Sequence, residues 1–192
     1  CGKLVVATNT AQLAALAQLE ERGRANGLIG LRRLSTREIR EVEPHIFGTE
    51  ALWVNETGIV DYRAVCEALA GAVREAGHAV QTATRVRRIV REDTTLKLET
   101  RAGFIPARYL VNCAGLQPDR VARMCGLEPG LRIVPFRGEY YVLKQARRDL
   151  VRGLVYPVPD PRYPFLGVHF TRRISGEIEA GPNAVLALKR EG

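Results

Sequence analysis

The segment between Asp61 and Gly77 constrains the fold more than any other part of this sequence. Apolar residues such as Val65 and Leu69 recur there at the spacing of one helix face. Asp61 is a favourable N-cap residue, and Gly77 suits a helix end because glycine adopts positive φ without steric cost. We therefore predict a helix over residues 62–76.

Shorter elements surround this helix. Ser35 and Glu38 form the S-x-x-E pattern of a capping box, and further helices are predicted over residues 10–26 and 119–124. Alternating helices and strands predict an α/β chain of the mixed α+β kind. The other apolar runs have strand character: residues 3–9, 51–55, 79–81, 85–91, 96–100, 109–112, 133–136, 139–143, 154–157, 166–171 and 177–180.

The length and hydropathy fit one large domain or parts of two. The chain has 192 residues, of which 46% are hydrophobic. Its apolar runs stay well below the roughly 18 residues of a membrane span, and no signal peptide is recognised. The first residue is Cys1, and a strand-like run follows it at once. We therefore expect an internal fragment that enters the fold after its natural beginning.

The net charge of +8 raises the question of a nucleic-acid partner. The arginines are scattered in pairs, such as Arg32 with Arg33 and Arg87 with Arg88, among acidic residues. A long basic run and interleaved stacking aromatics, which nucleic-acid binding favours, are missing from the sequence. We expect no nucleic-acid partner and a solvated basic surface, which leaves room for attraction of an anionic substrate or membrane.

The cysteines do not form a metal-binding pattern. Cys1, Cys66, Cys113 and Cys125 lack CxxC spacing and a companion histidine cluster. We expect buried free thiols in a reducing compartment, no metal, and a cytoplasmic location.

Residues 112–115, Asn-Cys-Ala-Gly, follow an apolar run and precede a helix start. Small residues at such a place let another backbone or a phosphate approach closely. An ordinary strand end is the alternative interpretation.

Three blocks resemble, in order and spacing, the D-amino-acid-oxidase-like flavoproteins: TGIVDYRAV at 57–65, TRVRRI at 84–89 and VNCAGL at 111–116. The resemblance implies FAD as the cofactor. It places the main chain of Val86 against the adenine end of FAD, and Ala114 and Gly115 beside the pyrophosphate.

Four later blocks are similar to the L-2-hydroxyglutarate oxidase/dehydrogenase branch: residues 134–141, 155–161, 165–171 and 180–184, with 1–9 fitting as well. The resemblance implies a small 2-hydroxy acid substrate, oxidised to 2-oxoglutarate by hydride transfer to flavin. Two alternatives stay open. One is a related flavoprotein acting on an amino acid or glycerol phosphate, and the other is a non-catalytic binding module that keeps only the substrate lobe.

One part of the family pattern is missing. A dinucleotide-binding domain places GxGxxG between a strand and a helix, so that backbone N–H groups meet the pyrophosphate. Gly23, Gly27 and Gly30 have the wrong spacing and lie at the end of a predicted helix or after it. We therefore expect this chain alone to bind FAD poorly and to be inactive.

Candidate site residues follow from the reaction. Arg137 suits a substrate carboxylate because guanidinium binds it bidentately, and His169 suits the base because histidine titrates near neutral pH. Tyr141 and Tyr156 are candidate carboxylate contacts, and Asn183 a contact to flavin or substrate. A surface arginine, a structural histidine, core tyrosines and a plain turn are the respective alternatives.

We expect a partial FAD/NAD(P)-binding-type domain over residues 56–126. Residues 1–55 and 127–192 are expected to form a mixed-sheet substrate domain of the D-amino-acid-oxidase-like fold. Apolar surface left open on the central segment predicts self-association. The sequence leaves open the electron acceptor and a peripheral contact with quinone or the inner membrane.

Overall fold

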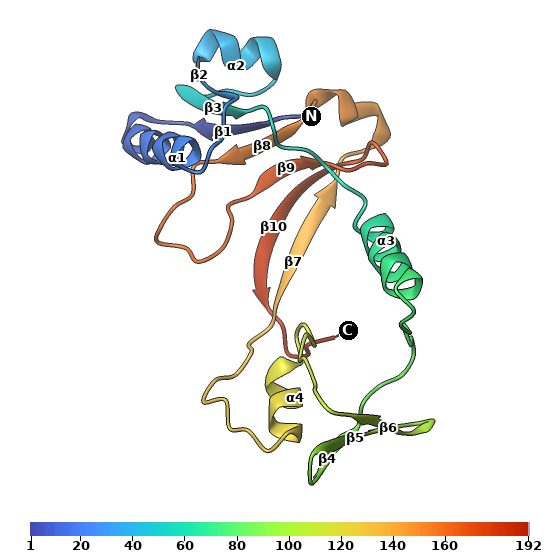
Figure 1. The fold of residues 1–192 in the computed structure, drawn as a ribbon. Coiled ribbons are helices and arrows are strands. Elements are labelled where there is room, and N and C mark those ends of the chain that lie inside the picture. The colour runs from blue at the N-terminus through green and yellow to red at the C-terminus, as the bar shows by residue number, and fades with distance from the viewer. Residues whose placement is uncertain (192) are drawn as a thin grey trace. The chain divides into compact units, whose positions relative to one another are not determined.

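The computed structural model describes residues 1–191 and divides into two compact units (Figure 1). Unit 1 comprises Cys1–Val65 and Arg137–Val185, and unit 2 comprises Cys66–Phe136 and Leu186–Gly192. The units change after residues 65, 136 and 185, whereas the domains are predicted to divide after residues 55 and 126. Whether the units are the substrate and FAD lobes stays a prediction.

Unit 1 is built on a seven-stranded sheet with the order β2-β3-β1-β8-β9-β10-β7. Strand β1, third in this order, pairs with β3 antiparallel and with β8 parallel, so the sheet is mixed and the predicted α+β class is confirmed. The strands are β1 (Lys3–Ala7), β2 (Leu31–Ser35), β3 (Glu50–Val54), β7 (Phe136–Val142), β8 (Leu154–Pro157), β9 (His169–Arg172) and β10 (Ile178–Leu186).

Helices pack on both faces of the sheet near β1. Successive side chains of a strand point to opposite faces, and here Leu4 joins a buried cluster with Ile39 of α2, whereas Val5 joins another with Leu16 of α1. This end of the sheet is therefore a closed core (Figure 1). The helical segments of unit 1 are η1 (Thr10–Gln12), α1 (Leu13–Ala25), α2 (Thr36–Val42) and η2 (Gln145–Leu150).

The helix starts predicted at Ser35 and Asp61 are confirmed, whereas the helix predicted from residue 10 begins as the 3-10 segment η1 and becomes α-helical at Leu13. Glu38 and Ser35 form the reciprocal hydrogen bonds of a capping box at α2. At α3 (Tyr62–Glu75), Asp61 Oδ1 accepts hydrogen bonds from the backbone N–H groups of Arg63, at 2.9 Å, and Ala64, at 3.4 Å. These caps form because donor and acceptor lie within three residues of each other.

Unit 2 has fewer buried residues. Its three-stranded antiparallel sheet has the order β4-β5-β6. Ile89 and Leu98 are its buried apolar residues, and α3, most of which lies in this unit, buries none. The elements are β4 (Arg88–Glu92), β5 (Thr95–Thr100), β6 (Gly103–Ala107) and α4 (Pro118–Met124).

Several strand predictions are wrong. Residues 79–81, 109–112 and 133–135 are not strands, although β2 and β6, which were not predicted, are. Tyr109 and Val111 are 86% and 83% exposed. Strand propensity is not sufficient, because a strand forms only where a neighbour completes its hydrogen bonds.

The prediction of buried thiols is also wrong. All four cysteines are free and exposed, because the elements that carry Cys66 and Cys125 leave those positions uncovered.

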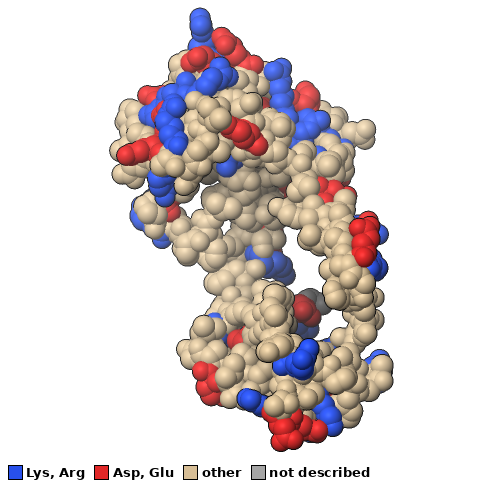
Figure 2. Space-filling view, viewed as in Figure 1, with Lys and Arg blue, Asp and Glu red and all other residues tan. Residues whose placement is uncertain are grey.

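Within residues 1–191, no group of three or more His, Cys, Asp or Glu side chains is arranged to hold a metal ion. No helix in that range combines the length and the apolar character that crossing a bilayer requires. Basic and acidic side chains intermingle on the face shown in Figure 2.

Candidate functional site

Tyr156 and His169 lie side by side on the sheet of unit 1. The pairing of Val155 with Phe170 places Tyr156 of β8 opposite His169 of β9. Their rings stack with centroids 4.0 Å apart and an interplanar angle of 13°. His169 is only 5% exposed, so the stack holds the imidazole in a defined orientation.

The second contact of His169 decides where its proton lies. Nδ1 is 2.8 Å from the carbonyl oxygen of Gly167. A carbonyl can only accept, so Nδ1 must carry the hydrogen, and in the neutral ring Nε2 keeps a lone pair. The geometry therefore prepares Nε2 to accept a proton.

On its other side, His169 pairs with Gly181 of β10. A Cβ at Gly181 would lie 2.7 Å from the carbonyl oxygen of Glu139 and from Cδ1 of Tyr140, so no side chain fits there. The ring of Tyr140 thus covers Gly181 on the sheet face that carries His169 and Tyr156. We call this surface the histidine face.

Arg137 and Tyr141 lie on the opposite face of β7. Side chains alternate along a strand, so residues one or three positions from Tyr140 point away from the histidine face. Arg137 Nη2 binds Glu139 Oε1 at 2.5 Å, and Tyr141 is 78% exposed. Asn183 is exposed on β10. The structure thus unites Tyr156 with His169 but separates both from Arg137 and Tyr141.

Two hollows border Tyr156. One, of about 660 Å³, is lined by Thr171, Arg173 and residues 58–63, and the other, of about 400 Å³, by Lys3 and Gly167 among others. Lys3 Nζ lies 5.3 Å from the centroid of the Tyr156 ring. The phenol of Tyr156 thus borders both hollows. Lys3 in the second is a cation that can meet an anionic group, whereas Arg173 in the first is paired with Glu179 at 2.8 Å.

The predicted cofactor residues lie together in unit 2. Val86 and Ala114 line one hollow of about 400 Å³, and Gly115 follows Ala114 with a positive φ of 53°. Asn112 shapes this loop, since its Nδ2 donates to the carbonyl oxygen of Pro118 at 2.8 Å and its Oδ1 accepts from the N–H of Ala114 at 3.3 Å. The side chain of Asn112 thus fixes the conformation of the loop that leads into α4.

The lining of this hollow, which we call the Val86 hollow, suits an aromatic base. Ile89, Leu98 and Met124 give it apolar walls. Gln117 also lines it, and the Oε1 atom of Gln117 is buried without a hydrogen-bond partner. A buried orphan acceptor is costly, so a donor such as a base amine or ribose hydroxyl fits there. The residues present therefore fit the adenine end of FAD.

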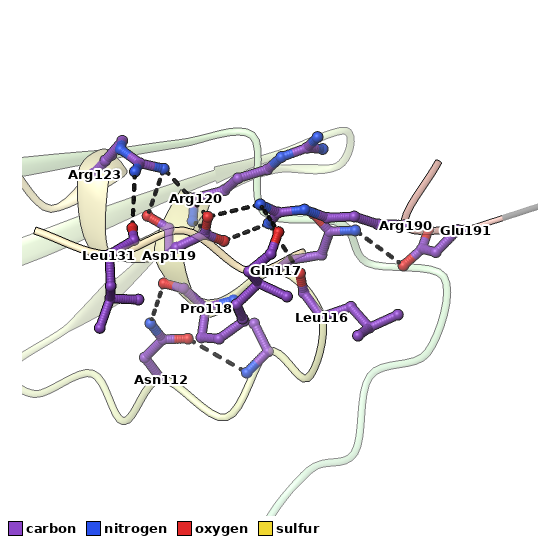
Figure 3. Close-up of polar contacts among 12 residues, drawn as sticks. Asn112, Leu116, Gln117, Pro118, Asp119, Arg120, Arg123, Leu131, Arg190 and Glu191 are labelled. Carbon is purple, nitrogen blue, oxygen red and sulfur yellow. Dashed lines mark hydrogen bonds and ion pairs between the residues drawn. The ribbon is translucent and has the colours of Figure 1, made fainter. Parts of the chain in front are cut away.

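A buried ion pair, missed by the sequence predictions, anchors the end of the chain to α4 (Figure 3). Arg190 binds Asp119 through two hydrogen bonds, with Nη2 2.7 Å from Oδ2 and Nη1 bound to Oδ1. Arg190 also donates to the carbonyl oxygens of Leu116 and Ile133, at 2.9 and 3.1 Å. Its guanidinium holds the pKa of the Asp119 carboxyl far below the usual range, although burial opposes this. Partners 71 residues apart leave no local sequence signal.

Comparison with known proteins gives a family match over nearly the whole chain. The family model described as DAO, FAD dependent oxidoreductase, matches residues 1–190. L-2-hydroxyglutarate dehydrogenase of Indibacter alkaliphilus is 47% identical and is matched over 100% of this chain and 48% of its own length. The mitochondrial L-2-hydroxyglutarate dehydrogenase of Homo sapiens is 44% identical, with 100% and 44% covered. The chain thus spans about half the length of these curated relatives.

Solved structures show the same fold at low identity. L-proline dehydrogenase from P. horikoshii has a TM-score of 0.83 at 18% identity, covering 98% of this chain and 50% of its own. The FAD-bound L-alpha-glycerophosphate oxidase from Mycoplasma pneumoniae has a TM-score of 0.80 at 23% identity, covering 99% and 51%.

Proposed function

Because the chain belongs to the FAD dependent oxidoreductase family, we propose that it forms part of an enzyme that oxidises L-2-hydroxyglutarate to 2-oxoglutarate. The observation that carries the substrate assignment is the similarity, along the whole chain, to relatives named L-2-hydroxyglutarate dehydrogenase. The stacked, tautomer-defined His169 supports the reaction type.

Oxidation of a 2-hydroxy acid removes the hydroxyl proton and the hydrogen on C2 with its electron pair. FAD, when bound, supplies the acceptor for that hydride. His169 takes the hydroxyl proton on Nε2, while the Gly167 carbonyl keeps the other nitrogen protonated. Stacking on Tyr156 prevents the imidazole from turning away from the substrate.

L-2-hydroxyglutarate carries two carboxylates, so its site needs more than one cationic or hydroxyl partner. Tyr156 is retained as a substrate contact because it adjoins His169. Arg137, Tyr141 and Asn183 stay predictions, and Arg137 would first have to leave Glu139. Lys3 borders Tyr156 and is the further cation that we assign to a substrate carboxylate.

For FAD, we propose that Val86, Ala114 and Gly115 contact the adenosine diphosphate half. The fit of the Val86 hollow to a base supports this assignment. The 192-residue sequence contains no GxGxxG motif, so we propose that the chain by itself binds FAD weakly and does not turn over.

The test is anaerobic flavin reduction. In the full-length, FAD-loaded enzyme of which we propose that this chain is a part, the flavin should bleach when L-2-hydroxyglutarate is added. Reduction by the D-isomer, an amino acid or glycerol 3-phosphate, with no response to L-2-hydroxyglutarate, would overturn the substrate assignment. The solved neighbours that act on proline and glycerophosphate make these the relevant alternatives. A flavin that none of them reduces would favour the non-catalytic binding module.

A matched pair of variants tests the proposed base. In the full-length enzyme, His169→Gln should slow flavin reduction by roughly 10²- to 10⁴-fold, the usual contribution of a positioned base. His45→Gln, at an exposed histidine, should leave the rate unchanged. Equal rates for both variants would remove His169 from the chemistry.

We further propose self-association through exposed apolar residues of unit 2, such as Leu69 and Val111. Sedimentation equilibrium of the protein and of Leu69→Ser measures it, and an unchanged monomer in both would refute it.

A cytoplasmic location with peripheral membrane or quinone contact is likewise a proposal, which co-sedimentation with lipid vesicles tests.

A further inference from the structure

A second hollow in unit 2 is strongly basic. It has a volume of about 760 Å³ and lies against α4 and residues 188–191. Six cationic and two acidic side chains line it, an excess of four positive charges. They are Arg85, Arg120, Arg123, Arg132, Lys189, Arg190, Asp119 and Glu191. We call it the arginine hollow.

The acids already have partners. Asp119 is held by Arg190 and, at 3.4 Å, by Arg123. Glu191 accepts from Gln117 Nε2 at 3.4 Å. Four cations thus remain, which form no ion pair with any of residues 1–191: Arg85, Arg120, Arg132 and Lys189.

Unpaired guanidinium groups around one hollow repel each other, and an anion between them removes that repulsion. Guanidinium forks match phosphate oxygens bidentately, and a diphosphate balances four excess charges better than a single carboxylate does. The volume lies within the range of small-ligand sites. We propose that the arginine hollow binds a diphosphate group, with Arg120 and Arg132 as principal contacts.

The position of the hollow suggests how such a ligand continues. Arg85, Gln117, Arg120 and Glu191 line both the arginine hollow and the Val86 hollow. The orphan Oε1 of Gln117 lies at this shared wall and can accept a hydrogen bond from a ribose hydroxyl or a base amine. An adenine nucleotide could therefore place its base in the Val86 hollow and its diphosphate among the arginines. This nucleotide version rests on the proposed function, whereas the diphosphate site does not.

Calorimetric titration of the protein with inorganic pyrophosphate, ADP and adenosine tests the site. Pyrophosphate and ADP should bind, and adenosine should bind at least tenfold more weakly than ADP. The double variant Arg120→Gln/Arg132→Gln should weaken binding of both phosphates at least tenfold. The control Arg32→Gln/Arg147→Gln removes the same charge from exposed arginines of unit 1 and should bind like the unmodified protein. Equal losses in both variants, or no binding of either phosphate, would overturn the proposal.

Repeating the pyrophosphate titration on the full-length protein saturated with FAD, as checked by its flavin absorbance, distinguishes the two sources of the diphosphate. Competition between FAD and pyrophosphate identifies the diphosphate of the cofactor, and unchanged pyrophosphate binding identifies a separate phosphorylated ligand. Because the readout is heat and not turnover, failure of L-2-hydroxyglutarate to bleach the flavin would refute the proposed function without affecting this result.

Discussion

The two units differ in how far each buries its own apolar residues. In unit 1 both faces of β1 are covered, with Leu4 and Leu16 fully buried in separate clusters. In unit 2, α3 leaves Leu69 64% exposed, and residues 109–111 pair with no strand of the described chain. Unit 1 thus completes its sheet from its own segments, whereas unit 2 keeps apolar surface available for other contacts.

The difference extends to function. The histidine face of unit 1 carries His169, the proposed base, held by ring stacking and strand pairing. Unit 2 carries basic and amide groups whose partners are incomplete, such as Gln117 and Arg132. Complete packing holds a side chain in one orientation. Charged groups and hydrogen-bonding groups that lack partners instead indicate a place for a ligand.

The largest expected effect is loss of stability in the core of unit 1. Ile39→Ala should lower the free energy of unfolding by about 2–5 kcal/mol, because it leaves a cavity at a fully buried position. Urea unfolding followed by fluorescence of Trp53, the single tryptophan, reports on this unit. In unit 2, Leu69→Ala should change the stability of α3, measured by hydrogen exchange of residues 66–75, by no more than about 0.5 kcal/mol. A comparable loss for Leu69→Ala would show that α3 is packed in solution, and the contrast between units would fail.

The next effect concerns the close approach of β7 and β10. Gly181→Ala should cost about 1–3 kcal/mol, because the added Cβ would meet the Glu139 carbonyl oxygen at 2.7 Å. Gly58→Ala is the control, since nothing lies within 4 Å of its added Cβ. The same urea titration measures both variants. Equal stability of the two would contradict the strand arrangement beside His169.

A smaller, pH-dependent effect is expected in unit 2. The folded pKa of Asp119 lies below its ordinary value of 3.8, so its ion pair stabilises fully above that value and is lost as the pH falls toward the folded pKa. Hydrogen exchange of α4, corrected for the intrinsic rate at each pH, should be slower in the unmodified protein than in Asp119→Asn. We call this difference in protection the gap. The gap should be constant above about pH 5 and should narrow below pH 3.8. Asp149→Asn, at an exposed position, should show no gap, and a gap for Asp119→Asn that widens in acid would reverse the assigned sign.

The smallest effect is a gain. Gly71→Ala in α3 should stabilise the helix by about 0.5–1 kcal/mol, because nothing lies within 4 Å of the added Cβ and alanine costs less backbone entropy. Greater hydrogen-exchange protection of residues 66–75 in Gly71→Ala than in the unmodified protein would confirm this gain in stability. Reduced protection would mean that another segment packs closely on Gly71.

The predictions that succeeded depend on residues close together in the chain. The Ser35 and Glu38 capping box and the Asp61 cap each join groups two or three residues apart. The strand β8 was also predicted, at residues 154–157, and the family blocks led to Val86 and Ala114, which the structure brings to one hollow. The strands predicted at 79–81 and 109–112 failed because their formation depends on distant neighbours.

The sequence by itself determined the class of fold, the helix boundaries at Ser35 and Asp61, and the family, since these depend on local patterns and on ordered blocks of residues. Only the tertiary structure decided that His169 stacks on Tyr156, that Arg137 points to the other face, and that Arg190 meets Asp119. Those relations depend on strand register and on chain closure over as many as 71 residues. A one-residue change of register reverses the face of every side chain, so these contacts were decided only when distant strands paired.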